Sequence, residues 1–321
     1  DLGRLLFFDP VISGDGRVSC AHCHHPDLAY GDGRRTGMGG AATGVGVART
    51  GGADLTRNTP ALWNVGFLGR LFWDGRVASL QAQAIEPLFA PDEMASTPEH
   101  IQRVLTANSG YRRLFAQAFG RDADRQITVE EVTTALAAFQ SSLVSLNSRF
   151  DRYAHGDERA LSDAEVRGWN VFRGFVGRCA QCHVPPLFGS DDLAVVGAPA
   201  VPGQPYDQGA GAVAPLDAAL KGAFKVPTLR NVALTAPYFQ AGQFATLREV
   251  MDFYNAPRGH AVPADAGVQL HWHIHMQKAE LSDGDVADVL EFLNALTDTS
   301  MAPPIPAAVP SGLPVVPRLH R

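Results

Sequence analysis

The sequence predicts an all-α fold of two domains, and three observations support this prediction. Apolar residues recur every three or four positions in several segments, most clearly across residues 128–146, as is typical of amphipathic helices. Strand signals are almost absent, while 32 glycines and 22 prolines indicate many loops around short helices. One pentapeptide motif occurs once in each half of the 321-residue chain, a length that suits two domains of ordinary size.

The repeated pentapeptide is Cys-x-x-Cys-His, and its two copies contain all four cysteines of the chain. This motif is the attachment site of c-type haem. Residues three apart share a face of a helical turn, so both thiols can form thioethers with the two haem vinyl groups. The histidine that follows can then ligate the iron. The sequence therefore predicts two covalent c-type haems, bound by Cys20, Cys23 and His24 and by Cys179, Cys182 and His183.

Paired cysteines have two other common uses, zinc binding and disulfide formation. Structural zinc sites usually keep their ligands close in sequence, whereas these two pairs lie far apart. A redox-active Cys-x-x-Cys disulfide is expected in a βαβ setting, which this sequence does not show. Two haems are therefore the better interpretation.

The composition argues against several classes of function. A net charge of −6 disfavours nucleic-acid binding and is compatible with a neutral or basic protein partner. No apolar run approaches the length of a membrane span. Covalent haem attachment takes place outside the bacterial cytoplasm, so we expect a periplasmic protein. Residues 1–8 read as the start of a mature chain from which a signal peptide has been removed.

The expected domain boundary follows the long helix in the middle of the chain. We expect one cytochrome c-like domain at residues 1–153, a second at 154–300, and a proline-rich tail at 301–321 that is an extended strap or a disordered end. In the second domain, two N-terminal capping patterns predict helix starts. These patterns are Ser162 with Glu165 and Ser282 with Asp285.

Several further segments resemble the bacterial di-haem cytochrome c peroxidase family, which includes the MauG proteins. The resemblance spans most of residues 1–300 and does not cover the tail. It implies an enzyme in which the N-terminal haem reacts with hydrogen peroxide and the C-terminal haem stores electrons. The segments that carry it occur in one order: 57–60, 72–76, 80–94, 148–151, 227–232 and 235–239.

The resemblance also implies roles for three residues near the first haem. Glu93 would be the acid–base group on the open face of that haem, since a desolvated carboxylate can take a proton from one peroxide oxygen and return it to the other. Gln83 would line the same pocket, and Trp73 would lie between the haems as an electron relay. Without the resemblance, Glu93 reads as a solvated charge beside Asp92, and Trp73 as a core residue.

Two more assignments follow from the resemblance. Asn58 and the backbone oxygens of Thr235 and Pro237 match the family's calcium site, and oxygen ligands of this kind suit a hard cation. Apart from the resemblance, these segments read simply as turns. Arg230 is expected to pair with a haem propionate, a charge-assisted contact that suits arginine.

Two departures from the usual family pattern indicate the MauG-like branch. The loop at 32–59 lacks the histidine that caps the first haem in many of these peroxidases, so its iron is expected to be open or water-bound. Where ordinary members place a methionine ligand, at the ninth position counted from Thr246, this chain has Tyr254. A phenolate ligand favours higher oxidation states than a thioether does. Met251 and Met276 are the alternative ligands.

The sequence thus predicts an enzyme that stores oxidising equivalents from hydrogen peroxide across both haems, as a bis-Fe(IV) state, from which a protein side chain could be oxidised. One alternative is an ordinary peroxidase that receives electrons from a small cytochrome or cupredoxin, and another is a non-catalytic electron-transfer protein. The alternating His271, His273 and His275 suggest a copper or zinc site, although a surface loop is the favoured interpretation.

Overall fold

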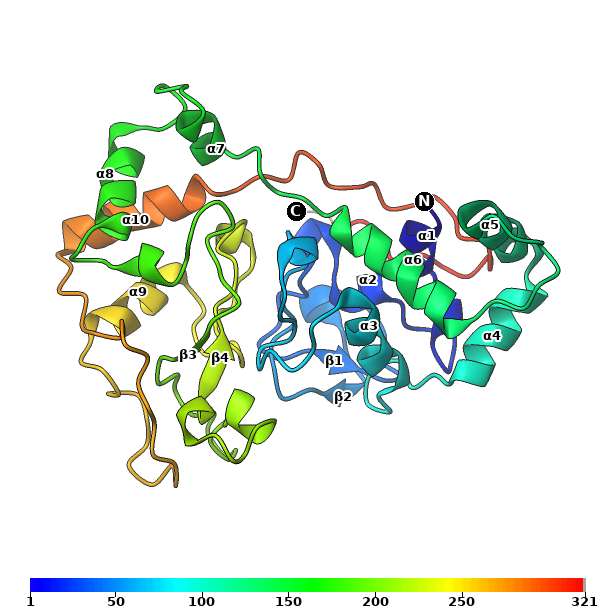
Figure 1. Cartoon of the computed structure of the whole chain (residues 1–321), viewed down its shortest axis with the longest axis horizontal. Coiled ribbons are helices and arrows are strands. Elements are labelled where there is room, and N and C mark those ends of the chain that lie inside the picture. The colour runs from blue at the N-terminus through cyan, green and yellow to red at the C-terminus, as the bar shows by residue number, and fades with distance from the viewer. Residues whose placement is uncertain (320–321) are drawn as a thin grey trace. The chain divides into compact units, whose positions relative to one another are not determined.

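The computed structural model describes residues 1–319, and its regular structure is mostly helical, as the sequence predicts (Figure 1). Two short antiparallel ladders join β1 to β2 and β3 to β4. None of the helices in residues 1–319 combines the length and hydrophobicity that crossing a membrane requires. The elements are α1 Leu2–Phe8, α2 Cys20–Cys23, β1 Met38–Gly39, β2 Ala53–Asp54, α3 Leu80–Phe89, α4 Pro98–Ala107, α5 Ser109–Phe119, α6 Val129–Ser141, α7 Arg149–Ala154, α8 Asp163–Arg173, β3 Leu193–Val195, β4 Ala223–Lys225, α9 Leu247–Asn255 and α10 Asp283–Asn294.

The chain divides into two compact units that alternate along the sequence. The first unit contains residues 1–67, residues 78–144 and the described residues from 302 onward. The second contains residues 68–77 and 145–301. This division differs from the boundary expected after residue 153, because α7 belongs to the second unit, where Phe150 packs into the hydrophobic core. Trp73 also belongs to the second unit.

The core of the first unit forms where α1 crosses α6. The crossing is close because Gly3 has no side chain, and a Cβ at this position would overlap the carbonyl oxygen of Ala135. The rings of Phe7 and Phe139 meet beside the crossing, with centroids 5.0 Å apart. Aromatic pairs in this tilted geometry stabilise a core beyond the area that they bury.

The second unit repeats this arrangement with α8 and α10. A Cβ on Gly168 of α8 would overlap the carbonyl oxygen of Asp288 on α10, so this crossing also depends on glycine. Trp169 and Phe292 pack beside it, with ring centroids 5.3 Å apart. Both helices begin at the predicted capping boxes, which are confirmed. Each unit is thus organised around one glycine-dependent crossing of two helices.

The long helix predicted for residues 128–146 is shorter in the structure. It begins as expected, with the Thr128 hydroxyl accepting the backbone N–H of Glu131, but α6 ends at Ser141. The Ser142 hydroxyl donates to the carbonyl oxygen of Phe139 over 2.6 Å and so satisfies one of the last helical carbonyls. Leu143 remains fully buried without being helical, which is why its spacing resembles a continuing helix.

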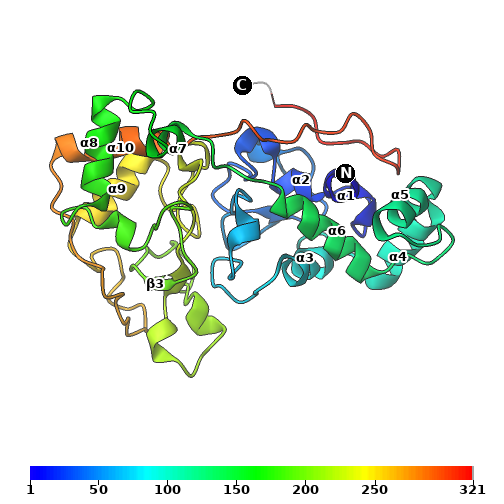
Figure 2. The same cartoon turned by 45° about the horizontal axis from the view of Figure 1, so that its top comes forward.

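The proline-rich tail is a strap along the first unit, visible in red in both orientations (Figures 1 and 2). The Ser311 hydroxyl donates to Asp9 over 2.7 Å, and Arg318 pairs with Asp27 over 2.9 Å. His25, which is fully buried, lies 3.0 Å from the Pro317 carbonyl oxygen through Nε2. Because its Nδ1 accepts the backbone N–H of Asp27, Nε2 carries the proton and donates it to Pro317. The strap therefore fixes the residue next to His24.

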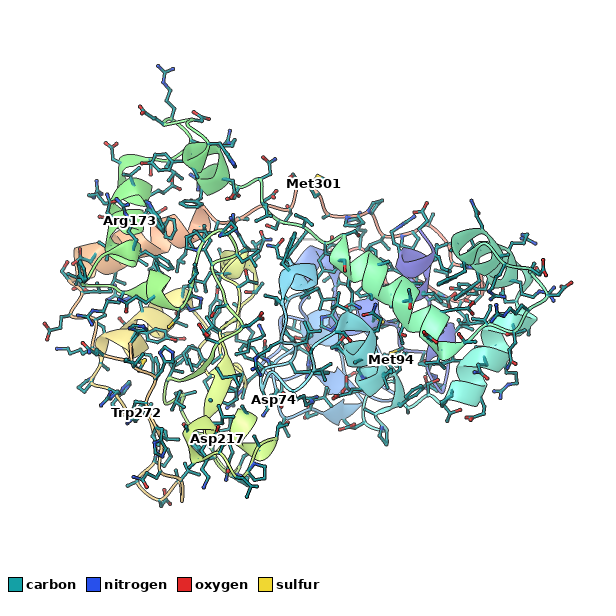
Figure 3. All side chains as sticks on the ribbon, in the orientation of Figure 1. Asp74, Met94, Arg173, Asp217, Trp272 and Met301 are labelled. Carbon is teal, nitrogen blue, oxygen red and sulfur yellow. The ribbon has the colours of Figure 1, made fainter. Side chains whose placement is uncertain are left out.

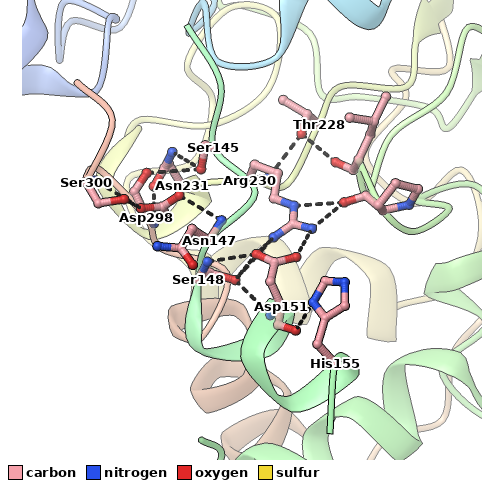
Figure 4. Close-up of polar contacts among 12 residues, drawn as sticks. Ser145, Asn147, Ser148, Asp151, His155, Thr228, Arg230, Asn231, Asp298 and Ser300 are labelled. Carbon is pink, nitrogen blue, oxygen red and sulfur yellow. Dashed lines mark hydrogen bonds and ion pairs between the residues drawn. The ribbon is translucent and has the colours of Figure 1, made fainter. Parts of the chain in front are cut away.

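A buried ion pair stabilises the second unit (Figure 4). Arg230 is 1% exposed and donates two hydrogen bonds to Asp151, over 2.6 and 2.7 Å. Its other donors bond Ser148 and the carbonyl oxygen of Pro186, so all five N–H groups are used. Burial alone would raise the pKa of Asp151, but the hydrogen bonds from Arg230 and Ser148 outweigh it and lower the pKa. The propionate contact predicted for Arg230 is at odds with this geometry, because no donor is left.

Replacing Asp151 by asparagine should destabilise the second unit strongly. The change leaves a buried guanidinium without its counter-charge, which typically costs about 3–5 kcal/mol of unfolding free energy. Denaturant titration of the holoprotein measures the loss, and Asp252→Asn, in the exposed pair with Arg248, is the matched control, with an expected loss below about 1 kcal/mol. The stabilisation by Asp151 is complete above the ordinary carboxyl pKa and is lost as the pH falls through the lowered pKa. Equal small losses in both variants would contradict this assignment.

Candidate functional sites

The first Cys-x-x-Cys-His motif forms the single helical turn α2. The backbone N–H of Ser19 donates to Nδ1 of His22 over 3.0 Å, which fixes the start of the turn. Cys20 and Cys23 are free thiols on one face of this turn. Burial is the main reason that their pKa values rise, to about 12 for Cys20 and about 11 for Cys23.

The His24 imidazole is oriented by the backbone that follows the motif. Its Nδ1 lies 3.0 Å from the carbonyl oxygen of Tyr30, which can only accept, so Nδ1 carries the proton and Nε2 has a lone pair. Burial lowers the pKa of His24 to about 4 and keeps the ring neutral. A neutral imidazole whose second nitrogen donates to a carbonyl oxygen is the usual form of a metal ligand.

The second motif reaches the same arrangement on a different backbone. Cys179 begins a short 3-10 turn rather than an α-helix. Nδ1 of His183 lies 3.0 Å from the Phe188 carbonyl oxygen and 3.1 Å from that of Pro227. Burial lowers the pKa of His183 to about 4, so this ring is also neutral with Nε2 available. Burial raises the pKa of both thiols, that of Cys179 to about 12.

Tyr254 lies beside the second motif. Helix α9 begins at a Thr246–Glu249 capping box and places the half-buried Tyr254 near its last turn. Burial is the main cause that raises the pKa of the Tyr254 phenol, and smaller contributions in the same direction come from Cys182 and Cys179 of the second motif. A ligand from this residue would approach the group that those thiols bind.

The alternative ligands of the second iron are placed less favourably. Met251 is 6% exposed and belongs to the hydrophobic core together with Val289 and Phe292. Met276 lies in an irregular segment, where its carbonyl oxygen accepts a hydrogen bond from Arg258. Tyr254 as the ligand of the second iron remains a prediction.

Glu93 belongs to the first unit and is close to its haem motif. It follows α3 in a turn, and its carbonyl oxygen accepts the backbone N–H of Gly40, next to β1, over 2.7 Å. The Glu93 carboxylate, though not the largest cause, contributes to the raised pKa values of Cys20 and Cys23 and is therefore near them. Gln83, on α3, lies in the same unit and is half-buried. Glu93 and the first motif thus belong to the same unit, and the catalytic role of Glu93 remains a prediction.

Trp73 belongs to the same unit as the second motif, and its carbonyl oxygen accepts the backbone N–H of Lys225 on β4 over 2.8 Å.

A different tryptophan, Trp63, lies near the first motif and was not foreseen from the sequence. It is fully buried and meets Tyr30 edge-on, with centroids 5.2 Å apart. Since the Tyr30 carbonyl oxygen orients His24, Trp63 supports that ligand indirectly. A single tryptophan without a motif gives no sequence signal for this role.

The residues predicted to bind calcium belong to both units. Asn58, in the first, donates through Nδ2 to the Arg34 carbonyl oxygen over 2.8 Å. Thr235 and Pro237 belong to the second unit, immediately after a short 3-10 turn. A calcium site built from these residues remains a prediction.

The alternating histidines lie on an irregular segment of the second unit, beside the labelled Trp272 (Figure 3). The rings of His273 and His275 are 5.5 Å apart between centroids. Among the residues that the structure describes, no group of three or more His, Cys, Asp or Glu side chains is placed to hold a metal ion. The irregular backbone of residues 271–275 agrees with the interpretation as a loop.

The donor chemistry of both sites fits a c-type haem. Each site offers two free thiols on one turn and a neutral imidazole whose Nε2 is available. Cys20, Cys23 and His24 would hold the first haem, and Cys179, Cys182 and His183 the second, with Tyr254 beside it. When bound, each haem would supply an iron that changes oxidation state. Fold and sites together define a c-type haem oxidoreductase.

Comparison with known proteins narrows this class to one family. A profile described as di-haem cytochrome c peroxidase matches residues 1–159. The methylamine utilization protein MauG of Methylorubrum extorquens is 38% identical over 296 residues, 92% of this chain and 77% of the relative. The cytochrome c551 peroxidase of Nitrosomonas europaea is 34% identical over 315 residues, 97% of this chain and 83% of the relative. This protein therefore belongs to the di-haem cytochrome c peroxidase family and is a haem-dependent oxidoreductase.

The fold comparison agrees with this assignment. The crystal structure of a MauG-like protein associated with microbial copper homeostasis superposes with a TM-score of 0.80 at 31% identity, covering 94% of this chain and 89% of that one. The diheme peroxidase BthA of Burkholderia thailandensis gives a TM-score of 0.75 at 28% identity, covering 98% and 89%. The fold of the family therefore extends through both units.

Proposed function

We propose that this protein reacts with hydrogen peroxide at the first haem and shares the oxidising equivalents across both haems, so that both irons reach Fe(IV). The observation that carries the proposal is the position of Tyr254, beside the second motif's thiols, while Met251 is packed in the core. A thioether ligand raises the reduction potential of a haem, whereas an anionic phenolate favours the oxidised state. The second haem would then accept an oxidising equivalent instead of supplying an electron.

At the first haem, we propose that Glu93 moves the protons of the bound peroxide. Its carboxylate would take a proton from one oxygen of hydrogen peroxide and return it to the other, which would leave as water. Gln83 would help to orient the peroxide from the same unit. The absence of histidine from residues 32–59 supports an open coordination position opposite His24.

The remaining assignments rest on the family resemblance. Trp73 is proposed as the relay between the haems, and Asn58, Thr235 and Pro237 as calcium ligands. We propose a periplasmic location, because covalent haem attachment takes place there. A side chain of a partner protein is the proposed reductant.

A second candidate is an ordinary peroxidase that draws electrons from a small cytochrome or cupredoxin. The relative named cytochrome c551 peroxidase, at 34% identity, favours this function. A non-catalytic electron-transfer protein is a third candidate, and it predicts that peroxide leaves both irons unchanged.

Mössbauer spectroscopy of the isotopically enriched diferric protein separates these functions. We expect one equivalent of hydrogen peroxide, added without prior reduction, to convert both irons to Fe(IV). An ordinary peroxidase would instead require prior reduction or leave the second iron ferric, and either result would refute the proposed storage of oxidising equivalents. Steady-state turnover with a small cytochrome as electron donor would then measure the ordinary activity.

A further inference from the structure

One buried cation of the first unit has no partner. Arg49 is 1% exposed, and none of its three guanidinium nitrogens forms a hydrogen bond. Its backbone, in contrast, is well fixed, with the N–H donating to Gly46 over 3.1 Å and the carbonyl oxygen accepting from Arg34 over 2.9 Å. A guanidinium has five N–H donors and stays charged, so burying it without acceptors is strongly unfavourable. Its surroundings are therefore expected to include an anionic ligand.

The turn that ends at Arg49 lies beside the first haem motif. A Cβ on Gly46 would come within 3.0 Å of Leu28 Cδ1, so this turn packs against the segment that directly follows His24. Arg49 follows a short 3-10 turn in the glycine-rich loop and so reaches the motif from that loop.

The Asp32 carboxylate does not serve as the partner of Arg49. Burial is the largest cause of the shifted pKa of Asp32 and raises it, although the Arg49 charge acts to lower this pKa. The Asp32 oxygens accept from the backbone N–H of Arg34 and from the Thr59 hydroxyl, each over 2.9 Å. No hydrogen bond joins Asp32 to Arg49, so the guanidinium has no acceptor on this carboxylate.

We propose that Arg49 binds a propionate carboxylate of the first haem. A haem attached through Cys20 and Cys23 brings two propionates to this unit, and a planar guanidinium can bind a carboxylate with two parallel hydrogen bonds. This pairing supplies acceptors for the unpartnered nitrogens and neutralises a propionate that would otherwise be buried as an anion. The inference depends on the first haem being bound but not on its reaction with peroxide.

Redox titration of the haem-loaded protein, without peroxide, tests this pairing. In Arg49→Gln the propionate charge is no longer neutralised, which stabilises ferric iron, so the reduction potential of the first haem should fall. The second haem is the internal reference and should keep its potential. Arg103→Gln removes an exposed charge from the same unit and should change neither potential.

Resonance Raman spectroscopy supplies a readout of the contact itself. We expect the propionate bending band of the first haem to shift in Arg49→Gln and also in Arg49→Lys, which retains the charge but loses the paired hydrogen bonds. If Arg49→Gln fails to take up haem, the redox titration and the Raman measurement are both made on Arg49→Lys. Unchanged potential and unchanged bands in a haem-loaded variant would overturn the proposal. The proposal would also be overturned if inorganic phosphate, added to the wild-type protein, shifted the reduction potential of the first haem in a saturable way. Arg49 would then bind a free anion instead of a propionate.

Discussion

Tyr254→Phe should abolish the storage of an oxidising equivalent at the second haem. The variant keeps the ring and its contacts with Phe239 and Phe253, whose centroids lie 6.1 and 5.1 Å away, but loses the phenol oxygen. With the ligand gone, one equivalent of peroxide should leave the second iron ferric while the first still reacts. Mössbauer spectra of the peroxide-treated variant and wild type measure this difference.

The complementary change, Tyr254→Met, should convert the second haem to the ligation of an ordinary peroxidase. We expect its reduction potential to rise by roughly a tenth of a volt or more, since axial ligands set haem potentials over a range of about 0.8 V. Spectroelectrochemical titration of the two haems measures the shift.

Because burial raises the pKa of the Tyr254 phenol, the phenol is protonated at neutral pH unless a metal ion displaces its proton. The wild-type potential should therefore become more positive as the pH falls and proton competition weakens the phenolate ligand.

Two control variants make this assignment specific. Tyr238→Phe removes another phenol of the same unit, whose hydroxyl donates to the Val232 carbonyl oxygen over 3.0 Å, and should leave both haems unchanged. Met251→Leu alters only core packing and should cost less than about 1.5 kcal/mol of unfolding free energy without changing either haem spectrum. If Met251→Leu instead changes the spectrum of the second haem, the sulfur is the ligand and Tyr254 is not.

Local sequence patterns predicted much of the secondary structure because the interactions involved are local. The capping boxes at Ser162 and Ser282 join residues three apart, so the helix starts could be read directly from the chain. The end of α6 was missed because Leu143 continues the apolar spacing through tertiary burial after the helix has stopped. The place of α7 in the second unit is equally hidden in the sequence, since the partner of Asp151 on α7 is 79 residues away.

The same distinction applies to the functional sites. The two haem motifs depend on spacing within one turn, and such spacing is visible in a sequence. Tyr254 was singled out by the family resemblance, and its role as a ligand remains a prediction. The sequence could not show that Arg230 bonds Asp151 and Pro186, because both acceptors are distant from it in the chain. Arg49 could not be singled out at all, because nothing in a glycine-rich loop indicates which arginine is buried. Long-range partners of charged residues are thus the part that requires a structure.

Glu93→Gln should slow the reaction with peroxide by about 10²–10⁴-fold, the usual contribution of a positioned acid–base group. Glutamine has nearly the same shape but cannot accept a proton from peroxide. The turn should persist, because its contact with Gly40 uses the Glu93 carbonyl oxygen. Stopped-flow spectroscopy of the diferric variant measures the rate, and unchanged potentials of both haems would show that electron transfer is intact.

The adjacent Asp92 provides the matched control for this prediction. Asp92 is exposed whereas Glu93 is half-buried, so Asp92→Asn removes the same charge from the same turn without removing the proposed acid–base group. We expect Asp92→Asn to react at close to the wild-type rate. Equal slowing in the two variants would mean that the negative charge of the turn matters rather than proton transfer by Glu93. A normal rate in Glu93→Gln would exclude Glu93 from the chemistry and leave the first haem without its proposed base.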